Sequence, residues 1–364
     1  MHNNTFRIAL AGLGNVGANT LRILLRDQEM LAQRYGVRFL VTGVAEFGGG
    51  AVSSTGLDIE RLLKTLNAGQ TVASLPDVGK PGLESSEMLK LAEPDFLLEA
   101  TPVNLEHGNP GLSVVREALQ QGVHVIMANK GPMALAYDEL IALSSSGDGW
   151  GRNYQPSTDG ADKPALRFSA CVAGALPTIN VGERDFAGCH ITRMEAVFNG
   201  TTQYILRAME ENQSYAEALA DAQERGIAET DPTLDVDGWD STAKLVIAAN
   251  QVLGHSCSIS DVAREGISQV SNEQVQHTLQ NKQRLVLVCL AEWDADKQTY
   301  QLSVRPTPLP LDHPLAQMTP DDMGVVFYSE EVERMAVLSS EPGPDSASAA
   351  MIRDMLDIIR TIPY

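Results

Sequence analysis

The chain has 364 residues, which at about 150 residues per domain is enough for two domains. A hydrophobic fraction of 43% with 20% charged residues is ordinary globular composition and excludes a disordered, collagen-like or disulfide-stapled chain. The 47 acidic residues outnumber the 27 basic ones, so the net charge is −20, and nucleic acid and anionic membrane surfaces are poor partners.

Targeting and metal signals are weak in this sequence. The apolar stretches are far shorter than the ~20 residues that cross a bilayer, and the N-terminus has no basic leader region. The histidines are scattered, so no metal site is predicted. The four cysteines lie far apart and are expected to be reduced: Cys171, Cys189, Cys257 and Cys289. We expect a soluble, cytoplasmic protein.

Short apolar segments alternate with helical patterns over the first 145 residues. Strands are predicted at residues 6–11, 37–45, 95–100 and 123–128, and helices at 16–25, 57–66, 111–121 and 136–144. Mostly apolar strands that alternate with helices are typical of a parallel sheet covered on both faces. We therefore expect an α/β domain with a Rossmann-type, doubly wound parallel sheet over residues 1–145.

The alternation stops at residues 144–163, a polar and glycine-rich segment that predicts a long exposed loop near a domain junction. After this segment the patterns predict an α+β arrangement. Strands are expected at 166–172, 191–198, 284–293 and 299–305, and helices from 177 and at 202–211, 215–225, 241–253, 259–266 and 348–359. We assign residues 146–320 to a second domain.

A glycine-rich turn follows the first predicted strand and opens the first predicted helix. Its sequence, Gly12-Leu13-Gly14-Asn15-Val16-Gly17, has the spacing and the context of a dinucleotide-binding turn. The first glycine permits a tight turn, the second lets the backbone approach a pyrophosphate, and the third lets helix and strand pack closely. The helix N-terminus would face the phosphates with partial positive charge. The alternative is an ordinary turn.

An acidic residue, Glu46, ends the second predicted strand. A carboxylate there can accept hydrogen bonds from ribose hydroxyls and would repel a 2′-phosphate. Because no arginine follows within several residues, the sequence favours NAD over NADP. The alternative is a solvated acid at a strand end.

Two more predicted strands end in polar residues, where open α/β sheets place ligands. Ala100 ends the third strand and Thr101 follows it, and Lys130 follows the fourth strand in an apolar neighbourhood. A lysine in that setting favours a site role over an exposed loop tip.

Acidic residues are densest between positions 229 and 240, just before a lysine. Asp240 and Lys244 are four residues apart and therefore share a helix face. An apolar run continues this helix into a core, and a lysine at such an edge beside carboxylates suits proton transfer. The carboxylates of this stretch could bind a substrate ammonium. A plain acidic loop or a calcium loop is the alternative, although the spacing is not that of an EF-hand.

Residues 197–206 read as a strand, a tight Asn199-Gly200 turn and a helix start. Thr201 or Thr202 is predicted to cap the helix. The free backbone N–H groups at the start of this helix could also bind a carboxylate.

Four segments together resemble the homoserine dehydrogenase family, in order and spacing over nearly the whole chain. They are Gly12–Gly17, Ala128-Asn129-Lys130-Gly131-Pro132, Asn199-Gly200-Thr201-Thr202-Gln203-Tyr204-Ile205-Leu206, and Glu229-Thr230-Asp231-Pro232 through Asp240 and Lys244. The resemblance implies a two-domain, usually dimeric enzyme that interconverts L-homoserine and L-aspartate 4-semialdehyde with NAD or NADP. It also implies the short form that lacks a C-terminal ACT domain, and a segment over 321–364 that returns to the nucleotide-binding domain.

The resemblance also implies a role for each matching residue. Lys244 would be the proton donor and acceptor, with Lys130 holding or polarising the reacting oxygen. The remaining expected substrate-binding residues are Glu229, Asp235, Asp240, Gly200 and Thr201. The expected cofactor-binding residues are Gly12, Gly14, Asn15, Val16, Gly17, Glu46, Ala100, Thr101 and Lys130.

Several positions depart from the family pattern. Ser169 stands where the family has a glutamate that ligates a structural monovalent cation, and Ala173 and Ala175 stand where it has glycines. The segment Glu341-Pro342-Gly343 replaces a Gly-Ala-Gly turn. These changes leave two alternatives open: a related enzyme acting on another amino-alcohol or aldehyde, and a catalytically inactive NAD-binding sensor.

Overall fold

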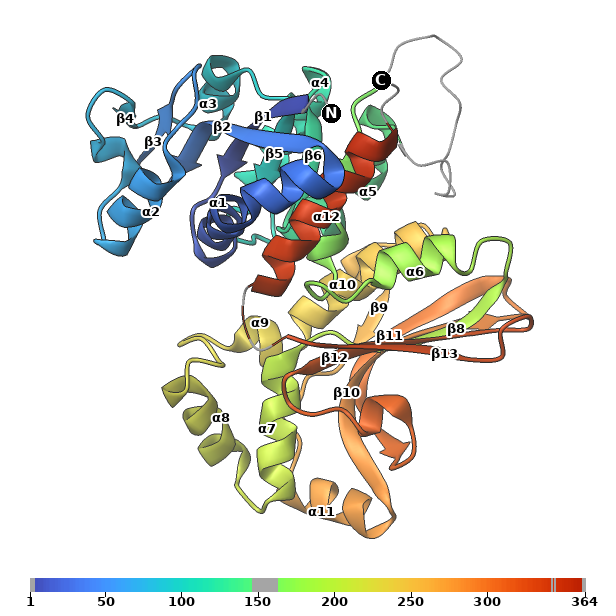
Figure 1. Cartoon of the computed structure of the whole chain (residues 1–364). Coiled ribbons are helices and arrows are strands. Elements are labelled where there is room, and N and C mark those ends of the chain that lie inside the picture. The colour runs from blue at the N-terminus through green and yellow to red at the C-terminus, as the bar shows by residue number, and fades with distance from the viewer. Residues whose placement is uncertain (1–3, 146–162, 342, 344, 362–364) are drawn as a thin grey trace. The chain divides into compact units, whose positions relative to one another are not determined.

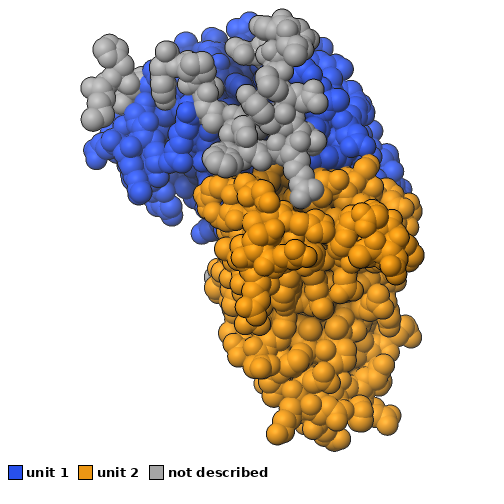
Figure 2. All heavy atoms as spheres, turned by 90° about the vertical axis from the view of Figure 1, so that its right-hand side faces the viewer, with its two compact units in different colours: residues 1–175, 343–364 blue, residues 176–342 orange. Residues whose placement is uncertain are grey.

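A computed structural model of the chain describes residues 4–145, 163–341, 343 and 345–361. It divides into two compact units: Met1–Ala175 with Gly343–Tyr364, and Leu176–Pro342 (Figures 1 and 2). Most of the predicted loop over 144–163 lies outside the described residues. Within the described residues, no helix is both long and apolar enough to span a membrane.

The first unit contains a seven-stranded sheet with strand order β4-β3-β2-β1-β5-β6-β7. Its elements are β1 (Asn4–Ala11), α1 (Asn15–Tyr35), β2 (Val37–Glu46), β3 (Gly49–Val52), α2 (Ile59–Asn67), η1 (Val72–Ser74), β4 (Gly79–Pro81), α3 (Ser85–Ala92), β5 (Phe96–Glu99), α4 (Gly111–Gln120), β6 (His124–Met127), α5 (Lys130–Leu143), β7 (Leu166–Arg167), η2 (Ser169–Cys171) and α12 (Asp345–Thr361). The neighbouring strands β2, β1, β5, β6 and β7 pair in parallel, whereas β3 and β4 pair antiparallel at one edge of the sheet. The predicted α/β class is confirmed.

Apolar side chains from both the strands and the helices form the core of this unit. Ile8, Leu10 and Leu98 are almost fully buried in the sheet, where they pack with Leu21 of α1 and Met355 of α12. Helices α1 and α12 lie side by side, and α3 and α4 contact each other on the other face of the sheet (Figure 1). Covering both faces buries most residues of these strands, which explains why they form continuous apolar runs in the sequence.

The second unit contains a six-stranded sheet with strand order β13-β12-β8-β10-β11-β9. Its elements are α6 (Thr178–Arg184), β8 (Ile191–Val197), α7 (Gly200–Glu210), α8 (Tyr215–Glu224), α9 (Thr233–Val236), α10 (Trp239–Ala248), the π-helical turn η3 (Ala249–Leu253), η4 (Ile259–Asp261), β9 (Val262–Arg264), α11 (Asn272–Gln280), β10 (Gln283–Asp294), β11 (Thr299–Pro310), η5 (Pro314–Ala316), β12 (Asp322–Ser329) and β13 (Met335–Ser340). The strands pair antiparallel except β9, which runs parallel to β11.

The unit boundaries differ from the expected ones at 145/146 and 320/321. Residues 163–175 belong to the first unit because β7 extends its sheet beside β6 and η2 packs on α12. Residues 321–341 belong to the second unit because β12 pairs with β8 and β13 pairs with β12. The segment from Gly343 onward, which carries α12, returns to the first unit.

Two predicted helices are also placed differently. The helix expected at 136–144 begins at Lys130, with a kink at Ala136 where φ is −136°. The helix expected at 259–266 is instead a single 3-10 turn followed by strand β9. Pairing of Val262 with Leu302 of β11 satisfies the backbone of this short segment and outweighs its local helical pattern.

Candidate active site

The glycine turn between β1 and α1 has the close contacts that its spacing predicts. Gly12 has a φ of +96°, and a Cβ there would lie 2.3 Å from the carbonyl oxygen of Ala100. A Cβ on Gly17 would lie 2.0 Å from the carbonyl oxygen of Gly12. Gly12 also donates its backbone N–H to the carbonyl of Ala45 at 2.8 Å. Any side chain at Gly12 or Gly17 would therefore push the turn away from the neighbouring strands.

Gly14, the second glycine of the turn, is not crowded by its surroundings. A Cβ built on Gly14 meets no atom within 4 Å, so the backbone is open on that side. Helix α1 begins with Asn15, Val16 and Gly17, has no side-chain cap and has no acidic residue in its first turn. Its free N–H groups therefore meet no competing carboxylate, as an anion site requires.

Glu46 ends β2 directly after Ala45, the residue that accepts the Gly12 hydrogen bond. Its Oε1 already accepts two hydrogen bonds, from Thr71 Oγ1 at 2.8 Å and from the Val72 backbone N–H at 2.7 Å. The carboxylate therefore lies at the edge of the sheet where ribose recognition is expected, and it also anchors the start of η1.

A buried carboxylate that sequence reasoning did not single out, Glu99, links the ends of β5 and β6. Its Oε1 accepts hydrogen bonds from the Thr101 backbone at 2.9 Å and the Asn129 side chain at 3.4 Å, and also from the Thr101 hydroxyl. Complete burial raises the pKa of Glu99 to about 7, although these hydrogen bonds oppose the rise. The only sequence signal is an acid that closes an otherwise apolar strand.

Lys130 is the first residue of α5, and Asn129 caps this helix by accepting the Gly131 backbone N–H at 2.9 Å. The same Asn129 side chain donates to Glu99 and, at 3.2 Å, to Thr101. The structure thus ties Thr101 and the start of the Lys130 helix to one buried carboxylate.

In the second unit, Asn199 organises the acidic cluster. Its side-chain oxygen caps α7 by accepting the Thr202 backbone N–H at 2.9 Å. Its Nδ2 donates to Asp235 at 2.7 Å and to Asp240 at 3.0 Å. The prediction that Thr201 or Thr202 caps this helix is wrong, because the asparagine side chain reaches the free N–H groups first.

Lys244 meets these carboxylates from helix α10. Its Nζ lies 2.8 Å from Asp240 Oδ2 and donates to the carbonyl oxygen of Phe198 at 2.6 Å. The Lys244 side chain is 14% exposed and the Asp240 side chain 8%. The expected helix-face pairing of Asp240 and Lys244 is therefore present, and the pair is largely shielded from water.

The carboxylates of Asp235 and Asp240 both interact with the single ammonium group of Lys244. Burial, together with the nearby Asp240 carboxylate, raises the pKa of Asp235, whereas Asn199 and Lys244 oppose the rise. Asp235 therefore holds its proton at a higher pH than an exposed aspartate does. An additional cationic group, such as a substrate ammonium, would be attracted to this cluster.

Of the other expected substrate residues, Thr201 adjoins the cluster, because its side chain forms a hydrogen bond that opposes the rise in the pKa of Asp235. Thr201 is buried on α7 and donates its hydroxyl to the Ile227 carbonyl at 3.1 Å. Gly200 begins α7, and a Cβ there would meet only ordinary contacts. Glu229 is exposed after α8, and its carboxylate bonds to no other described residue. The structure does not bring Glu229 into contact with Lys244.

Within the described residues, none of the four cysteines forms a disulfide. Cys289 lies closest to the cluster, with its Sγ 3.7 Å from the Ser241 carbonyl oxygen. Burial raises the pKa of this thiol to about 12, so it stays protonated and acts as core packing.

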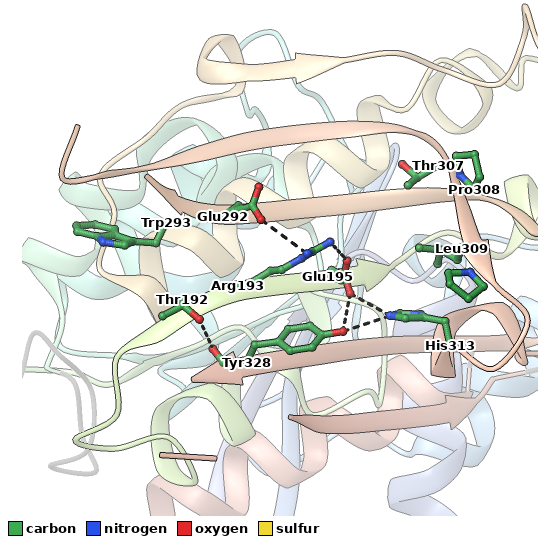
Figure 3. Close-up of a pocket in the computed structure, with 11 residues that line it drawn as sticks. Thr192, Arg193, Glu195, Glu292, Trp293, Thr307, Pro308, Leu309, His313 and Tyr328 are labelled. Carbon is green, nitrogen blue, oxygen red and sulfur yellow. Dashed lines mark hydrogen bonds and ion pairs between the residues drawn. The ribbon is translucent and has the colours of Figure 1, made fainter. Parts of the chain in front are cut away.

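A separate hollow of about 610 Å³ lies on the second sheet, lined by residues of β8, β10, β11 and β12. Figure 3 shows Arg193, His313 and Tyr328 directed at the buried carboxylate of Glu195. Tyr328 and His313 donate to Glu195 Oε2 at 2.9 and 3.1 Å. These bonds satisfy the carboxylate internally and hold η5 against the sheet.

A Rossmann-type unit and a shielded lysine–carboxylate cluster define the class of NAD(P)-dependent oxidoreductases. The family model for the NAD-binding domain of homoserine dehydrogenase matches residues 12–149, and the model for homoserine dehydrogenase itself matches residues 177–356. The chain therefore belongs to the homoserine dehydrogenase family, the NAD(P)-dependent enzymes that interconvert L-homoserine and L-aspartate 4-semialdehyde.

Individual relatives agree with this assignment. A homoserine dehydrogenase of Methanocaldococcus jannaschii is 32% identical over 96% of this chain and 98% of its own. An NAD(+)-dependent homoserine dehydrogenase of Pseudomonas canavaninivorans is 31% identical over 97% and 96%. A crystal structure from Archaeoglobus fulgidus, assigned as a homoserine dehydrogenase, superposes with a TM-score of 0.81 at 28% identity, covering 97% of this chain and 99% of that chain. These matches confirm the resemblance and favour it over the two alternatives.

Proposed function

We propose that Lys244 is the proton donor and acceptor in this reaction and that Asp235 and Asp240 bind the polar groups of the substrate. In the reductive direction, the Lys244 ammonium donates a proton to the aldehyde oxygen while the carbonyl carbon receives a hydride. In the oxidative direction, neutral Lys244 accepts the hydroxyl proton of L-homoserine while the same carbon loses a hydride. The bound nicotinamide supplies or receives that hydride.

The observation that carries this proposal is the environment of the Lys244 ammonium. It lies 2.8 Å from Asp240 and 2.6 Å from a backbone carbonyl, and its side chain is only 14% exposed. Fixed partners hold the proton in one place, and exclusion of water strengthens a hydrogen bond from this ammonium to a substrate oxygen. Lys130 is proposed to help hold the same oxygen, and Gly200 and Thr201 to border the substrate.

The coenzyme is proposed to bind at Gly12, Gly14, Asn15, Val16 and Gly17, with Ala100 and Thr101 alongside. Open space at Gly14 and a helix start without an acid support this assignment. We propose NAD as the preferred coenzyme because Glu46 at the end of β2 would repel the 2′-phosphate of NADP. The Pseudomonas canavaninivorans relative is NAD(+)-dependent, which supports this preference.

Lys244→Ala tests the proton-transfer assignment. We expect turnover of L-homoserine to fall by ~10²-fold or more, because the developing charge on oxygen loses its proton partner. NAD binding, measured by fluorescence titration, should stay near the unmodified value. The matched control is Lys64→Ala at an exposed position on α2, which should leave both quantities unchanged. Full turnover by Lys244→Ala would overturn the assignment.

We also propose that the enzyme is a cytoplasmic homodimer. The four cysteines, none of which forms a disulfide within the described residues, support a reducing compartment, and the family resemblance supports the dimer. Light scattering coupled to size-exclusion chromatography should give twice the 39.2 kDa chain mass. A fully active species with the mass of one chain would contradict the dimer.

A further inference from the structure

The segment around Ser169 is where the family pattern implies a glutamate that ligates a monovalent cation. Here the residue is a serine, and both of its donors are used within the first unit. The Ser169 hydroxyl donates to Asp354 Oδ1 at 2.5 Å, and its backbone N–H donates to Asp354 Oδ2 at 3.0 Å. Position 169 therefore lacks the carboxylate with which the family binds the cation. The serine there uses both of its hydrogen-bond donors on Asp354 of α12.

The guanidinium of Arg353 contacts the oxygen atoms of this segment instead. Arg353 Nη2 donates to Ser169 Oγ at 2.9 Å, and Nη1 donates to the Ala175 carbonyl oxygen at 3.2 Å. Arg353 Nε also lies 3.9 Å from Asp354 Oδ1. One planar cation thus donates hydrogen bonds to the hydroxyl oxygen and the carbonyl oxygen and lies within ion-pair distance of the carboxylate.

The local charge also disfavours an added cation. Asp354 is completely buried, and burial raises its pKa, whereas Arg353, Ser169 and Arg167 oppose the rise. One carboxylate is therefore faced by two guanidinium groups. Na⁺ or K⁺ at Ser169 would add a positive charge beside these two guanidinium groups and the one carboxylate that they face. The other carboxylate at this segment, Glu341, accepts the Leu176 N–H at 2.9 Å and the Ser339 hydroxyl at 2.6 Å.

We propose that the guanidinium of Arg353 serves as a built-in cation in this segment, so that the enzyme needs neither Na⁺ nor K⁺ for stability or turnover. The donor set does not fit the family's cation, and the arginine supplies the positive charge covalently. The segment 169–175 is then held to α12 whatever monovalent salt is present.

Exchange of the buffer cation tests this proposal on the unmodified enzyme. The thermal unfolding midpoint and kcat/KM for L-homoserine are measured in NaCl, KCl and N-methyl-D-glucamine chloride at equal ionic strength. We expect midpoints within about 1 °C of each other and equal kcat/KM. A bound cation with a Kd of about 1 mM would instead raise the midpoint by roughly 5–10 °C at 100 mM. A saturable rise in Na⁺ or K⁺ alone would overturn the proposal.

Paired substitutions extend the test to the residues themselves. Ser169→Glu with Arg353→Ala restores a carboxylate and removes the guanidinium, and its midpoint should become higher in Na⁺ or K⁺ than in N-methyl-D-glucamine. Ser169→Glu alone keeps the built-in cation and should show no such difference. A cation-dependent midpoint in Ser169→Glu alone would show that Arg353 does not exclude the metal. If the double variant does not fold, the salt comparison on the unmodified enzyme still decides the question.

Discussion

The side-chain nitrogen of Asn199 lies 2.7 Å from Oδ1 of Asp235, and the oxygen of the same amide caps α7. The nitrogen also donates to Asp240 at 3.0 Å. One asparagine therefore fixes the start of a helix and, at the same time, holds two carboxylates together beside Lys244. The helix cap and the proposed substrate site are coupled through this single side chain.

Asn199→Asp separates these two roles. Aspartate still caps α7, so the start of the helix is kept, and the free energy of unfolding should fall only through the acidic cluster, whose buried acceptors lose their donor. It offers no donor to Asp235 and Asp240, and a third negative charge joins them. Because a hydrogen bond to a charged group is worth about 1.5–3 kcal/mol, kcat/KM for L-homoserine should fall by roughly 10- to 100-fold. Asn199→Ala should lose about 1 kcal/mol more in stability. Unchanged kcat/KM in Asn199→Asp would contradict the positioning role.

Glu99 should make stability depend on pH. Burial raises its pKa from 4.5 to about 7, so the folded protein binds more protons than the unfolded chain between these values. The free energy of unfolding should therefore fall as the pH rises through this window, by about 3 kcal/mol in total.

Glu99→Gln, measured by urea unfolding from pH 4 to pH 8, isolates this contribution. Glutamine keeps an oxygen for the Thr101 and Asn129 donors but does not titrate, so the difference between the two stability curves should follow the titration of Glu99 alone. Glu87→Gln at an exposed position on α3 is the control and should leave the curve unchanged. A parallel pair of curves for Glu99→Gln and the unmodified enzyme would refute the raised pKa.

The sequence predicts the fold well where local pattern and tertiary environment agree. The strands ending near Ala11, Ala45, Glu99 and Met127 are apolar because both of their faces are covered, and their periodicity therefore identifies them. Pairing partners are not encoded locally. The short strands β3 and β9 are held by neighbours distant in sequence, so the sequence pattern missed the first and misread the second as helix.

The candidate site also combines features that local sequence predicts with features that depend on residues distant in sequence. The four-residue spacing of Asp240 and Lys244 predicts their contact, because helix geometry fixes it. The parts played by Asn199 and Glu99 depend on hydrogen bonds to residues about thirty or forty positions away, which spacing alone does not reveal. Similarly, the serine at position 169 shows that a carboxylate is missing, whereas only the structure identifies Arg353 as its neighbour.

Coenzyme choice can be tested at Glu46 without disturbing the loop that it anchors. Glu46→Gln keeps the Oε1 acceptor for Thr71 and Val72 and removes the negative charge. We expect kcat/KM with NADP, relative to NAD, to rise by about 10-fold, since one unit of charge repulsion near the 2′-phosphate is worth about 1 kcal/mol. Glu60→Gln on α2 should not change the ratio. An unaltered ratio in Glu46→Gln would remove the proposed ribose role.

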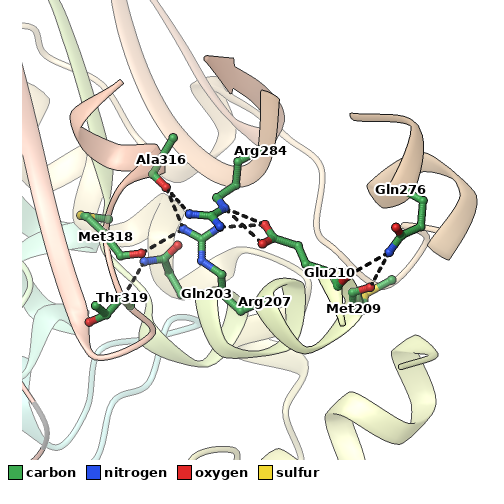
Figure 4. A network of polar contacts seen from close by, with 9 residues as sticks. All are labelled: Gln203, Arg207, Met209, Glu210, Gln276, Arg284, Ala316, Met318 and Thr319. Atoms are coloured by element: carbon green, nitrogen blue, oxygen red, sulfur yellow. Dashed lines mark hydrogen bonds and ion pairs between the residues drawn. The ribbon is translucent and has the colours of Figure 1, made fainter. Parts of the chain in front are cut away.

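The last prediction concerns a charged network far along α7 from Asn199 (Figure 4). Glu210 Oε1 accepts hydrogen bonds from Arg207 and Arg284, both at 2.8 Å. The two arginines also donate to the Ala316 carbonyl, at 3.2 and 2.6 Å. Burial lowers the pKa of Arg207 to about 10. Attraction to Glu210 opposes this fall, and repulsion from Arg284 adds to it. The single carboxylate therefore holds two partly buried cations together.

Glu210→Ala leaves these two guanidinium groups side by side without a counter-charge. We expect the free energy of unfolding to fall by about 3 kcal/mol, as happens when one partner of a buried ion pair is removed. The neighbouring, exposed Glu211→Ala is the control and should change it by less than about 0.5 kcal/mol. Urea unfolding of both variants at pH 7 measures the difference, while NAD titration checks that the first unit still binds coenzyme. Equal losses in the two variants would show that Glu210 acts only as a surface charge.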